Sequence, residues 1–304
     1  MTTRLTFLLA ALSLCMGCAG STPVAKKSGK PTVFVVGLPL QYFAERIGGD
    51  AVEVHFPLPK DQDPEFWKPD AGTVEGYQKA DLILLNGAGY AKWTANASLP
   101  LATSVDTSAA FKTKYIAIEG AVTHSHGPAG EHTHSGTASH TWLDFTQAVQ
   151  QANAIKDALT KLRPEQKSDF ESRFKSLEKD LMNLDREMLS LVGNNASKPL
   201  LASHPVYQYW ERRYGLNLKS VHWEPTDVPD DKAIAELKKV LEGHAAKWMV
   251  WEDEPKPETI AKLKELGIRC AVFNPCETAP ETGDFLTQMG KNIENMKPVF
   301  ANMP

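Results

Sequence analysis

A long amphipathic pattern between Glu165 and about Val192 restricts the possible folds of this chain more than any other part of its sequence. Its apolar residues follow one another at alternating steps of four and three: Phe170, Phe174, Leu177, Leu181, Leu184, Met188 and Leu191. This spacing puts them on one face of an α-helix, which at 1.5 Å per residue is about 40 Å long. A helix with such a face packs either on a partner helix in a coiled coil or along two lobes of its own chain.

Short apolar segments typical of buried strands alternate with helical segments on both sides of this helix. Before it, we expect strands at 32–37, 51–56 and 81–85 and helices at 41–47, 74–80 and 143–162. After it, we expect strands at 199–202, 248–251 and 268–273 and helices at 206–214, 230–241, 257–266 and 282–296. This alternation is typical of βαβ units. It predicts an α/β fold of two lobes, each with a mostly parallel sheet flanked by helices, joined by a long rigid interdomain helix.

The expected domain boundaries follow from this order. We place an N-terminal α/β lobe at 32–143, a helical region at 144–194 that contains the linker helix at 165–192, and a C-terminal α/β lobe at 195–304. A chain of 304 residues is long enough for two such lobes.

The first residues have the composition of a targeting segment. Arg4 precedes an apolar run from Leu5 to Met16, and small residues follow. The stretch CMGCA at 15–19 resembles a bacterial lipoprotein signal, in which residues 1–18 contain the signal, cleavage occurs before Cys18, and Cys18 then carries lipid. The alternative is a plain secretory peptide that is cut nearby. Both predict a periplasmic or otherwise extracytoplasmic protein, with 19–31 as a flexible tether.

The remaining composition limits the partners that we expect. A net charge of −4 gives no reason to expect nucleic acid. No apolar run after the N-terminus approaches the ~20 residues that span a bilayer, so we expect the protein to meet the membrane only through its lipid anchor. We also expect a monomer. Cys270 and Cys276 lie outside the targeting segment. In an oxidising compartment we expect a disulfide between them, and the alternative is a buried thiol at Cys270 with a free thiol at Cys276.

Residues 124–140, HSHGPAGEHTHSGTASH, hold five of the nine histidines of the chain: His124, His126, His132, His134 and His140. A run of small and polar residues cannot bury a core, so we expect most of it to be a mobile solvated loop. Neutral imidazole is a common ligand for zinc, and such a run can collect ions without a preformed site. The alternative is a polar linker with chance histidines. His140 differs because it stands at the start of a helix, where its side chain can be held in place.

Candidate ligands lie where the predicted strands end, and ligands of open α/β sheets bind beyond the carboxyl ends of the strands. Glu65 follows 51–56, His204 follows 199–202, and Asn274 and Glu277 follow 268–273. With His140, these residues offer two imidazoles, a carboxylate and a further oxygen donor. That set suits four-coordinate Zn²⁺, and it suits Mn²⁺ better than three histidines would.

Each candidate also has a purely structural interpretation. Glu65 could be a surface carboxylate, His204 a hydrogen-bonded core residue, and His140 the last residue of the loop. Asn274 could only stabilise a turn before Pro275. The three remaining histidines have no predicted partners, and we expect them to be structural or exposed: His55, His222 and His244.

Six motifs from Thr32 to the C-terminus occur in an informative order: GLPLQYFAERIGGDAVEV, DPEFWKP, KADLILLNGAGYAKW, SHTWLD, ASHPVYQYWERRYGL and GIRCAVFNP. In this order they resemble the cluster A-I solute-binding proteins, which are the metal-binding subunits of bacterial ABC importers for zinc or manganese. The resemblance implies an extracytoplasmic protein that captures Zn²⁺ and hands it to the permease of an importer. It also implies a small movement of the lobes during transfer and no enzymatic activity.

The resemblance assigns the ligands position by position. The family's first ligand, the histidine of a DPH motif, falls on Glu65, and the second and third fall on His140 and His204. The aspartate of its DPLG-like turn falls on Asn274, so Glu277, three residues on, is the expected source of the missing carboxylate. These two departures from the family pattern leave the identity of the metal open.

Other functions remain as alternatives. The first is the binding of manganese or another divalent ion by a protein of the same family. The second is a lipid-anchored periplasmic zinc buffer or chaperone that serves no transporter. A zinc hydrolase is disfavoured because the sequence contains neither HExxH nor GxSxG.

Overall fold

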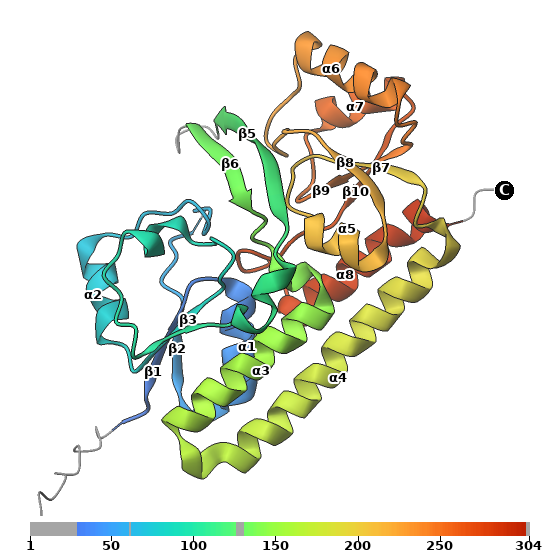
Figure 1. Cartoon of the computed structure of the whole chain (residues 1–304). Helices are drawn as coiled ribbons and strands as arrows, with labels where there is room; N and C mark the ends of the chain where they lie inside the picture. The colour runs from blue at the N-terminus through green and yellow to red at the C-terminus, as the bar shows by residue number, and fades with distance from the viewer. Residues whose placement is uncertain (1–28, 61, 126–130, 302–304) are drawn as a thin grey trace, which may run out of the picture.

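The computed structural model describes residues 29–60, 62–125 and 131–301, without the side chains of 119–135. Figure 1 shows two lobes side by side on a base of long helices, with a two-stranded hairpin rising between them. This arrangement confirms the predicted fold of two α/β lobes joined by a long helix.

The N-terminal lobe contains a four-stranded parallel sheet in the order β2-β1-β3-β4. Its strands are β1 (Thr32–Val35), β2 (Glu53–His55), β3 (Leu82–Leu85) and β4 (Ser104–Asp106). Its helical elements are α1 (Leu38–Gly48), η1 (Gly49–Ala51), α2 (Ala71–Lys79), η2 (Lys92–Ala95) and η3 (Ala109–Lys114), where η marks a 3-10 helix. Val33, Ile83 and Leu84 of the central strands are fully buried, as parallel strands covered on both faces require.

The C-terminal lobe repeats this arrangement with a parallel sheet in the order β10-β9-β7-β8. Its strands are β7 (Pro199–Ala202), β8 (Asn217–Ser220), β9 (Trp248–Trp251) and β10 (Arg269–Val272). Its helices are α5 (Gln208–Tyr214), α6 (Asp231–Glu242), α7 (Pro257–Glu265) and α8 (Phe285–Phe300). All four residues of β9 are buried, whereas β8 is largely exposed and pairs only with β7.

The helical base consists of η5 (Thr141–Leu143), α3 (Phe145–Leu162), η6 (Pro164–Gln166), α4 (Lys167–Val192) and η7 (Gly193–Asn195). Helix α4 contacts α1 and α3 on one side and α5 and α8 of the C-terminal lobe on the other. Phe285 of α8 also packs on Phe43 of α1, with ring centroids 5.3 Å apart. The apolar face of α4 is therefore covered within the chain, and one continuous core runs through both lobes.

Several elements differ from the sequence-based expectation. Strands β4 and β8 were not expected, because short edge strands such as SVD and NLKS carry no apolar run. The histidine-rich stretch was expected to be a mobile loop, but it contributes to the hairpin of β5 (Ala117–Ser125) and β6 (Glu131–Thr137). The backbone register sets His124 opposite His132 and Val122 opposite His134.

The expected disulfide is absent, and Cys270 and Cys276 are free thiols. Cys270 of β10 packs on the cluster around Met249 and Trp251, whereas Cys276 is buried in the main core. The strand β10 directs Cys270 into one cluster, and the turn after it, where Cys276 has φ +62°, directs Cys276 into the other. Burial raises the pKa of Cys270 to about 11 and that of Cys276 to about 12, so both thiols stay protonated at neutral pH.

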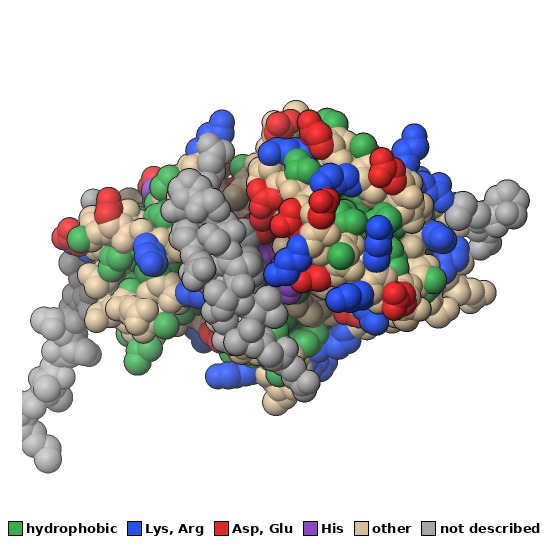
Figure 2. All heavy atoms as spheres, turned by 90° about the horizontal axis from the view of Figure 1, so that it is seen from above, with side chains coloured by type: hydrophobic (Ala, Val, Ile, Leu, Met, Phe, Trp, Pro, Cys, Tyr) green, Lys and Arg blue, Asp and Glu red, His purple; other side chains and the backbone are tan. Residues whose placement is uncertain are grey.

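The distribution of charged side chains on the surface agrees with the net charge of −4. Figure 2 shows acidic and basic side chains intermixed on the face of the C-terminal lobe that is seen from above. Among the described residues, no helix has both the length and the apolar composition to cross a bilayer. The expected signal peptide at 1–18, with Cys18, lies outside the described residues, as do 19–28 of the tether.

Candidate metal centre

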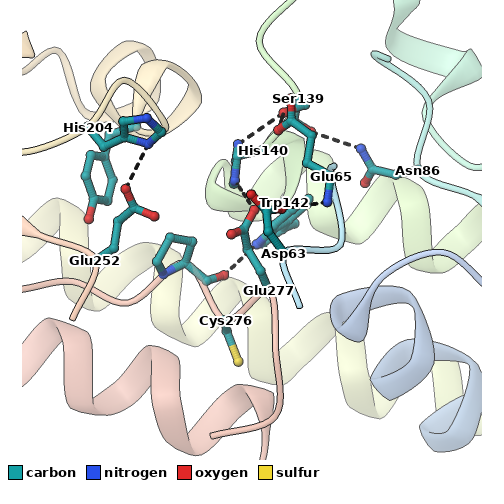
Figure 3. A network of polar contacts seen from close by, with 12 residues as sticks. Asp63, Glu65, Asn86, Ser139, His140, Trp142, His204, Glu252, Cys276 and Glu277 are labelled. Carbon is teal, nitrogen blue, oxygen red and sulfur yellow. Dashed lines mark hydrogen bonds and ion pairs between the residues drawn. The ribbon is translucent and has the colours of Figure 1, made fainter. Parts of the chain in front are cut away.

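Three of the five predicted ligands meet where the two lobes face each other. Glu65 lies in the loop after β2, His140 directly precedes η5, and Glu277 follows β10. One ligand atom from each lies within 4.8 Å of the other two. Glu65 and His140 are buried, and the Glu277 side chain is 19% exposed. Because Glu277 comes from the C-terminal lobe, the cluster joins the two lobes (Figure 3).

The Glu65 carboxylate is held through both of its oxygens. The Ser139 hydroxyl donates to Oε2 over 2.8 Å, and Lys92 Nζ lies 3.3 Å from Oε1. The Glu65 backbone N–H donates to Asp63 Oδ1 over 2.8 Å, which closes the turn that aims Glu65 at the cluster. This hydrogen-bonded turn therefore fixes the segment of the loop that carries the Glu65 side chain.

The His140 ring is fixed between the two lobes. Its Nε2 forms a short contact with Glu277 Oε1, and Ser139 Oγ lies 3.2 Å from its Nδ1. The rings of Trp142 and Tyr90 pack on it, with centroids 5.0 and 6.0 Å away. Trp142 Nε1 donates to Pro275 O over 2.8 Å, which ties this segment to the Glu277 loop. The ring can therefore present Nε2 to an ion without rearrangement of its own segment.

Carboxylates lie close to the His140 imidazole in the cluster. Burial lowers the pKa of His140, but the carboxylates of Glu277 and Glu65 outweigh it and raise this pKa to about 9. Asp63 as a whole is exposed, but desolvation of its carboxyl, followed by the charges of Glu277 and Glu65, raises its pKa to about 7. Carboxylates crowded in a buried site are stabilised by a bound cation. The arrangement can therefore hold a divalent metal ion.

Asn274 lies outside this cluster. Its Oδ1 accepts the Cys276 backbone N–H over 2.7 Å, and its own N–H donates to Asn292 Oδ1 over 3.0 Å. Cys276 has φ +62°, a left-handed conformation that the Asn274 side chain stabilises. The resulting turn directs Glu277 toward His140. We therefore leave Asn274 out of the proposed ligand set.

His204 is near the cluster but outside it. It lies after β7 with its Nδ1 3.0 Å from Glu252 Oε1 and its Nε2 3.9 Å from Glu224 Oε1. Burial lowers the pKa of His204, but Glu252 and then Glu224 outweigh it, so this pKa is raised. Figure 3 shows His204 with Glu252 apart from Glu65 and His140.

The other histidines occupy different positions. His55 of β2 packs on Phe34, and His244 is buried with its Nε2 2.7 Å from Leu200 O. The ring of His222 lies 6.1 Å from that of His204, and burial, followed by the charge of His204, lowers its pKa. The auxiliary residues His124, His132 and His134 lie on the hairpin strands, and His126 lies outside the described residues.

A cavity of about 280 Å³ leads to the cluster. Its lining includes Glu65, Lys92, Ser139 and His140 from the site and Gly136 from the base of the hairpin. Sequence reasoning missed four residues that shape this region: Asp63, Lys92, Ser139 and Glu252. The first, third and fourth of these were recognisable only as sequence neighbours of a predicted ligand or as a polar residue after a predicted strand, and Lys92 had no such signal.

Comparison with known proteins identifies relatives along almost the whole chain. Residues 33–299 match the profile of the ZnuA family, described as the periplasmic component A of a zinc-uptake complex. The high-affinity zinc uptake system protein ZnuA of Bacillus subtilis is 24% identical over 304 residues, which cover 96% of this chain and 95% of that protein.

A second relative is longer than this chain. The zinc-binding protein AdcA of Streptococcus pyogenes serotype M1 is 23% identical over 287 residues, and the match covers 88% of this chain but only 56% of AdcA. The chain thus spans about half the length of such relatives. Among solved structures, the metal-dependent lipoprotein YcdH of B. subtilis has a TM-score of 0.74 at 21% identity, covering 88% of this chain and 99% of YcdH. The last likeness shows a shared fold.

Proposed function

The chain belongs to the ZnuA family of periplasmic zinc-uptake components, and from this premise we propose that it captures Zn²⁺ and delivers it to the permease of an ABC importer. The observation that carries the proposal is the buried cluster of Glu65, His140 and Glu277 between the lobes. The family and the fold are those of solute-binding proteins rather than enzymes.

In this proposal, zinc binds Glu65, His140 and Glu277, and His204 Nε2 becomes the fourth ligand when the ion is bound. A tetrahedral zinc site commonly uses four such nitrogen and oxygen donors. His204 follows β7 and Glu277 follows β10, so both lie beyond the carboxyl ends of strands in the C-terminal sheet. Glu252 holds the opposite ring nitrogen of His204. A carboxylate on the far nitrogen of a ligating histidine fixes the ring and increases its basicity.

The remaining parts of the proposal concern delivery. We propose a monomer, anchored outside the cytoplasm through a lipid on Cys18, whose hairpin histidines gather ions near the cavity. The lobes at 32–143 and 195–304 would move slightly about the helical region at 144–194 to release the ion. The continuous core that runs through both lobes supports a small movement rather than a wide opening.

The donor set favours a second candidate ion. Two carboxylates with one or two imidazoles suit Mn²⁺ better than a site of three histidines does. Relative affinity does not distinguish the two ions, because a site of this kind binds Zn²⁺ more tightly than Mn²⁺ whichever ion it serves. Growth of a strain that lacks the gene does distinguish them, since added Zn²⁺ should restore growth if the cargo is zinc and added Mn²⁺ if it is manganese.

A competition titration against a chromophoric chelator tests capture. We expect Glu65→Gln and Glu277→Gln each to weaken zinc binding at least about tenfold, because each removes a charged ligand. His55→Gln is the matched control, since His55 lies on β2 outside the cluster, and it should bind as the parent does. A parent that binds no zinc tightly would contradict the proposal.

Delivery needs a separate test. A strain that lacks the gene should grow poorly in zinc-chelated medium, and the parent gene should restore growth whereas Glu65→Gln should not. Restored growth by Glu65→Gln, or normal growth without the gene, would favour a buffer that serves no transporter.

A further inference from the structure

Lys92 is attached to the proposed ligand Glu65 at two points. Its backbone N–H donates to Glu65 O over 3.0 Å, and its Nζ lies 3.3 Å from Glu65 Oε1. Its Nζ also lies 3.8 Å from the centroid of the Phe66 ring, which can stabilise the ammonium by a cation–π contact. These contacts hold a positive charge beside a carboxylate that points into the metal cluster.

The two side-chain partners of Glu65 differ in what they do to an incoming cation. The Ser139 hydroxyl on Oε2 is neutral and can remain as a hydrogen-bond donor to a ligating carboxylate. The ammonium on Oε1 carries a positive charge and repels a divalent ion at the same carboxylate. Of these two partners, only Lys92 competes with the metal.

Lys92 also has a path away from Glu65. Its side chain is 40% exposed, whereas that of Glu65 is 10% exposed. Both residues line the cavity of about 280 Å³ that leads to His140. A lysine has a flexible four-carbon stem and a strongly hydrated ammonium, so the charge can move into water while the backbone stays in place.

Resting on the proposed function, we propose that Lys92 is a built-in competitor for the captured ion. Its ammonium neutralises Glu65 in the empty protein and leaves when a divalent cation arrives. The free energy of breaking this ion pair is subtracted from that of metal binding. Lys92 therefore limits the affinity and makes the ion easier to release to a permease.

The first test measures zinc affinity of the full chain by chelator competition in the parent and two Lys92 variants. Lys92→Met keeps the length and removes the charge, and we expect its Kd to fall about tenfold, which corresponds to about 1.4 kcal/mol. Lys92→Arg keeps the charge and should stay close to the parent. Lys79→Met is the matched control, because it breaks a 2.5 Å ion pair with Glu75 on the exposed surface of α2.

The second test needs no variant. Lysines of the parent are acetylated with an amine-reactive ester, with and without one equivalent of Zn²⁺, and the modified positions are measured by mass spectrometry. Zinc should speed the modification of Lys92 several-fold, because the ammonium is released into water, while the modification of Lys79 should not change.

The outcomes separate this inference from the proposed function. Tight zinc binding with an unchanged or weaker affinity in Lys92→Met overturns the competitor role, because a merely structural lysine would support the site. An unchanged or slower modification of Lys92 in zinc overturns it as well. A parent that binds no zinc overturns the proposed function, and this inference with it.

Discussion

The two lobes present their proposed ligands to the same gap with opposite charges around them. In the N-terminal lobe, Glu65 is a carboxylate whose Oε1 lies 3.3 Å from the Lys92 ammonium. In the C-terminal lobe, His204 is an imidazole flanked by Glu252 on Nδ1 and Glu224 near Nε2. His140 and Glu277 already join the lobes between these two positions.

This difference predicts that the two counter-charges act in opposite directions on metal binding. Lys92 competes for the metal-binding atom, so its removal should tighten binding. Glu252 holds the ring nitrogen opposite the proposed ligand atom, so it should position His204 and its removal should weaken binding.

The largest effect is expected at the point where the lobes meet. His140→Ala removes the imidazole that both Glu65 and Glu277 approach, and it should weaken zinc binding more than about 100-fold, beyond the usual effect of an outer-shell residue. Chelator competition measures this change, with His55→Gln as the control. A loss of less than tenfold would mean that the metal does not bind at the join between the lobes.

The dependence of stability and of zinc affinity on pH distinguishes the metal-free cluster of Glu65, His140 and Glu277 from the metal-bound one. The pKa of the buried His140 rises from 6.5 to about 9 on folding, so the native state holds more protons than the unfolded state between these two values. The stability of the metal-free protein should therefore fall as the pH rises through 7 toward 9. Zinc affinity should rise over the same range, by up to about tenfold per pH unit for each proton released.

Thermal unfolding and zinc titration at pH 6, 7, 8 and 9 would check these opposite trends. Metal-free stability that increases with pH, or zinc affinity that does not depend on it, would contradict the protonated state that we assign to the empty cluster.

The role of Glu252 is the sharpest contrast with Lys92. Glu252→Gln keeps the size of the side chain but removes the charge next to His204 Nδ1, and we expect zinc binding to weaken about tenfold. The same titration on Lys92→Met gives the opposite sign. If both variants tighten binding, Glu252 is a competitor like Lys92, and the proposed contrast between the lobes is wrong.

The smallest effect is expected at Asn274. Its Oδ1 accepts the Cys276 N–H, and an aspartate can make the same hydrogen bond. Asn274→Asp should therefore change the Kd for zinc by less than about threefold. A large gain in affinity would show instead that this position reaches the ion.

Much of the architecture could be predicted from the sequence. The strands at 199–202 and 248–251 are apolar enough to be predicted from composition alone. The spacing of apolar residues from Phe170 to Met188 predicted the long helix. The short edge strands could not be found, because pairing with a neighbour rather than their own composition stabilises them. The absence of a disulfide between Cys270 and Cys276 could not be predicted, because it depends on the direction in which each side chain leaves the backbone.

For the candidate site, the sequence predicted the ligands but not the charged residues around them. Glu65 and Glu277 were predicted from their positions after strands and His140 from its position at a helix start, and the structure brings the three together. Their charged neighbours Lys92 and Glu252 could not be assigned, because neither a lysine at the start of a short 3-10 helix nor a glutamate after a strand has a sequence pattern that marks it. Whether the three residues bind metal stays a prediction.

The central claim is that one ion binds at the join between the lobes. A crystal structure of the protein with one equivalent of Zn²⁺, with anomalous diffraction measured at the zinc edge, tests it directly. We predict a single strong anomalous peak within coordination distance of Glu65, His140 and Glu277. A peak at the histidine-rich hairpin or beside His204 and Glu224 alone, with the join empty, would contradict the account.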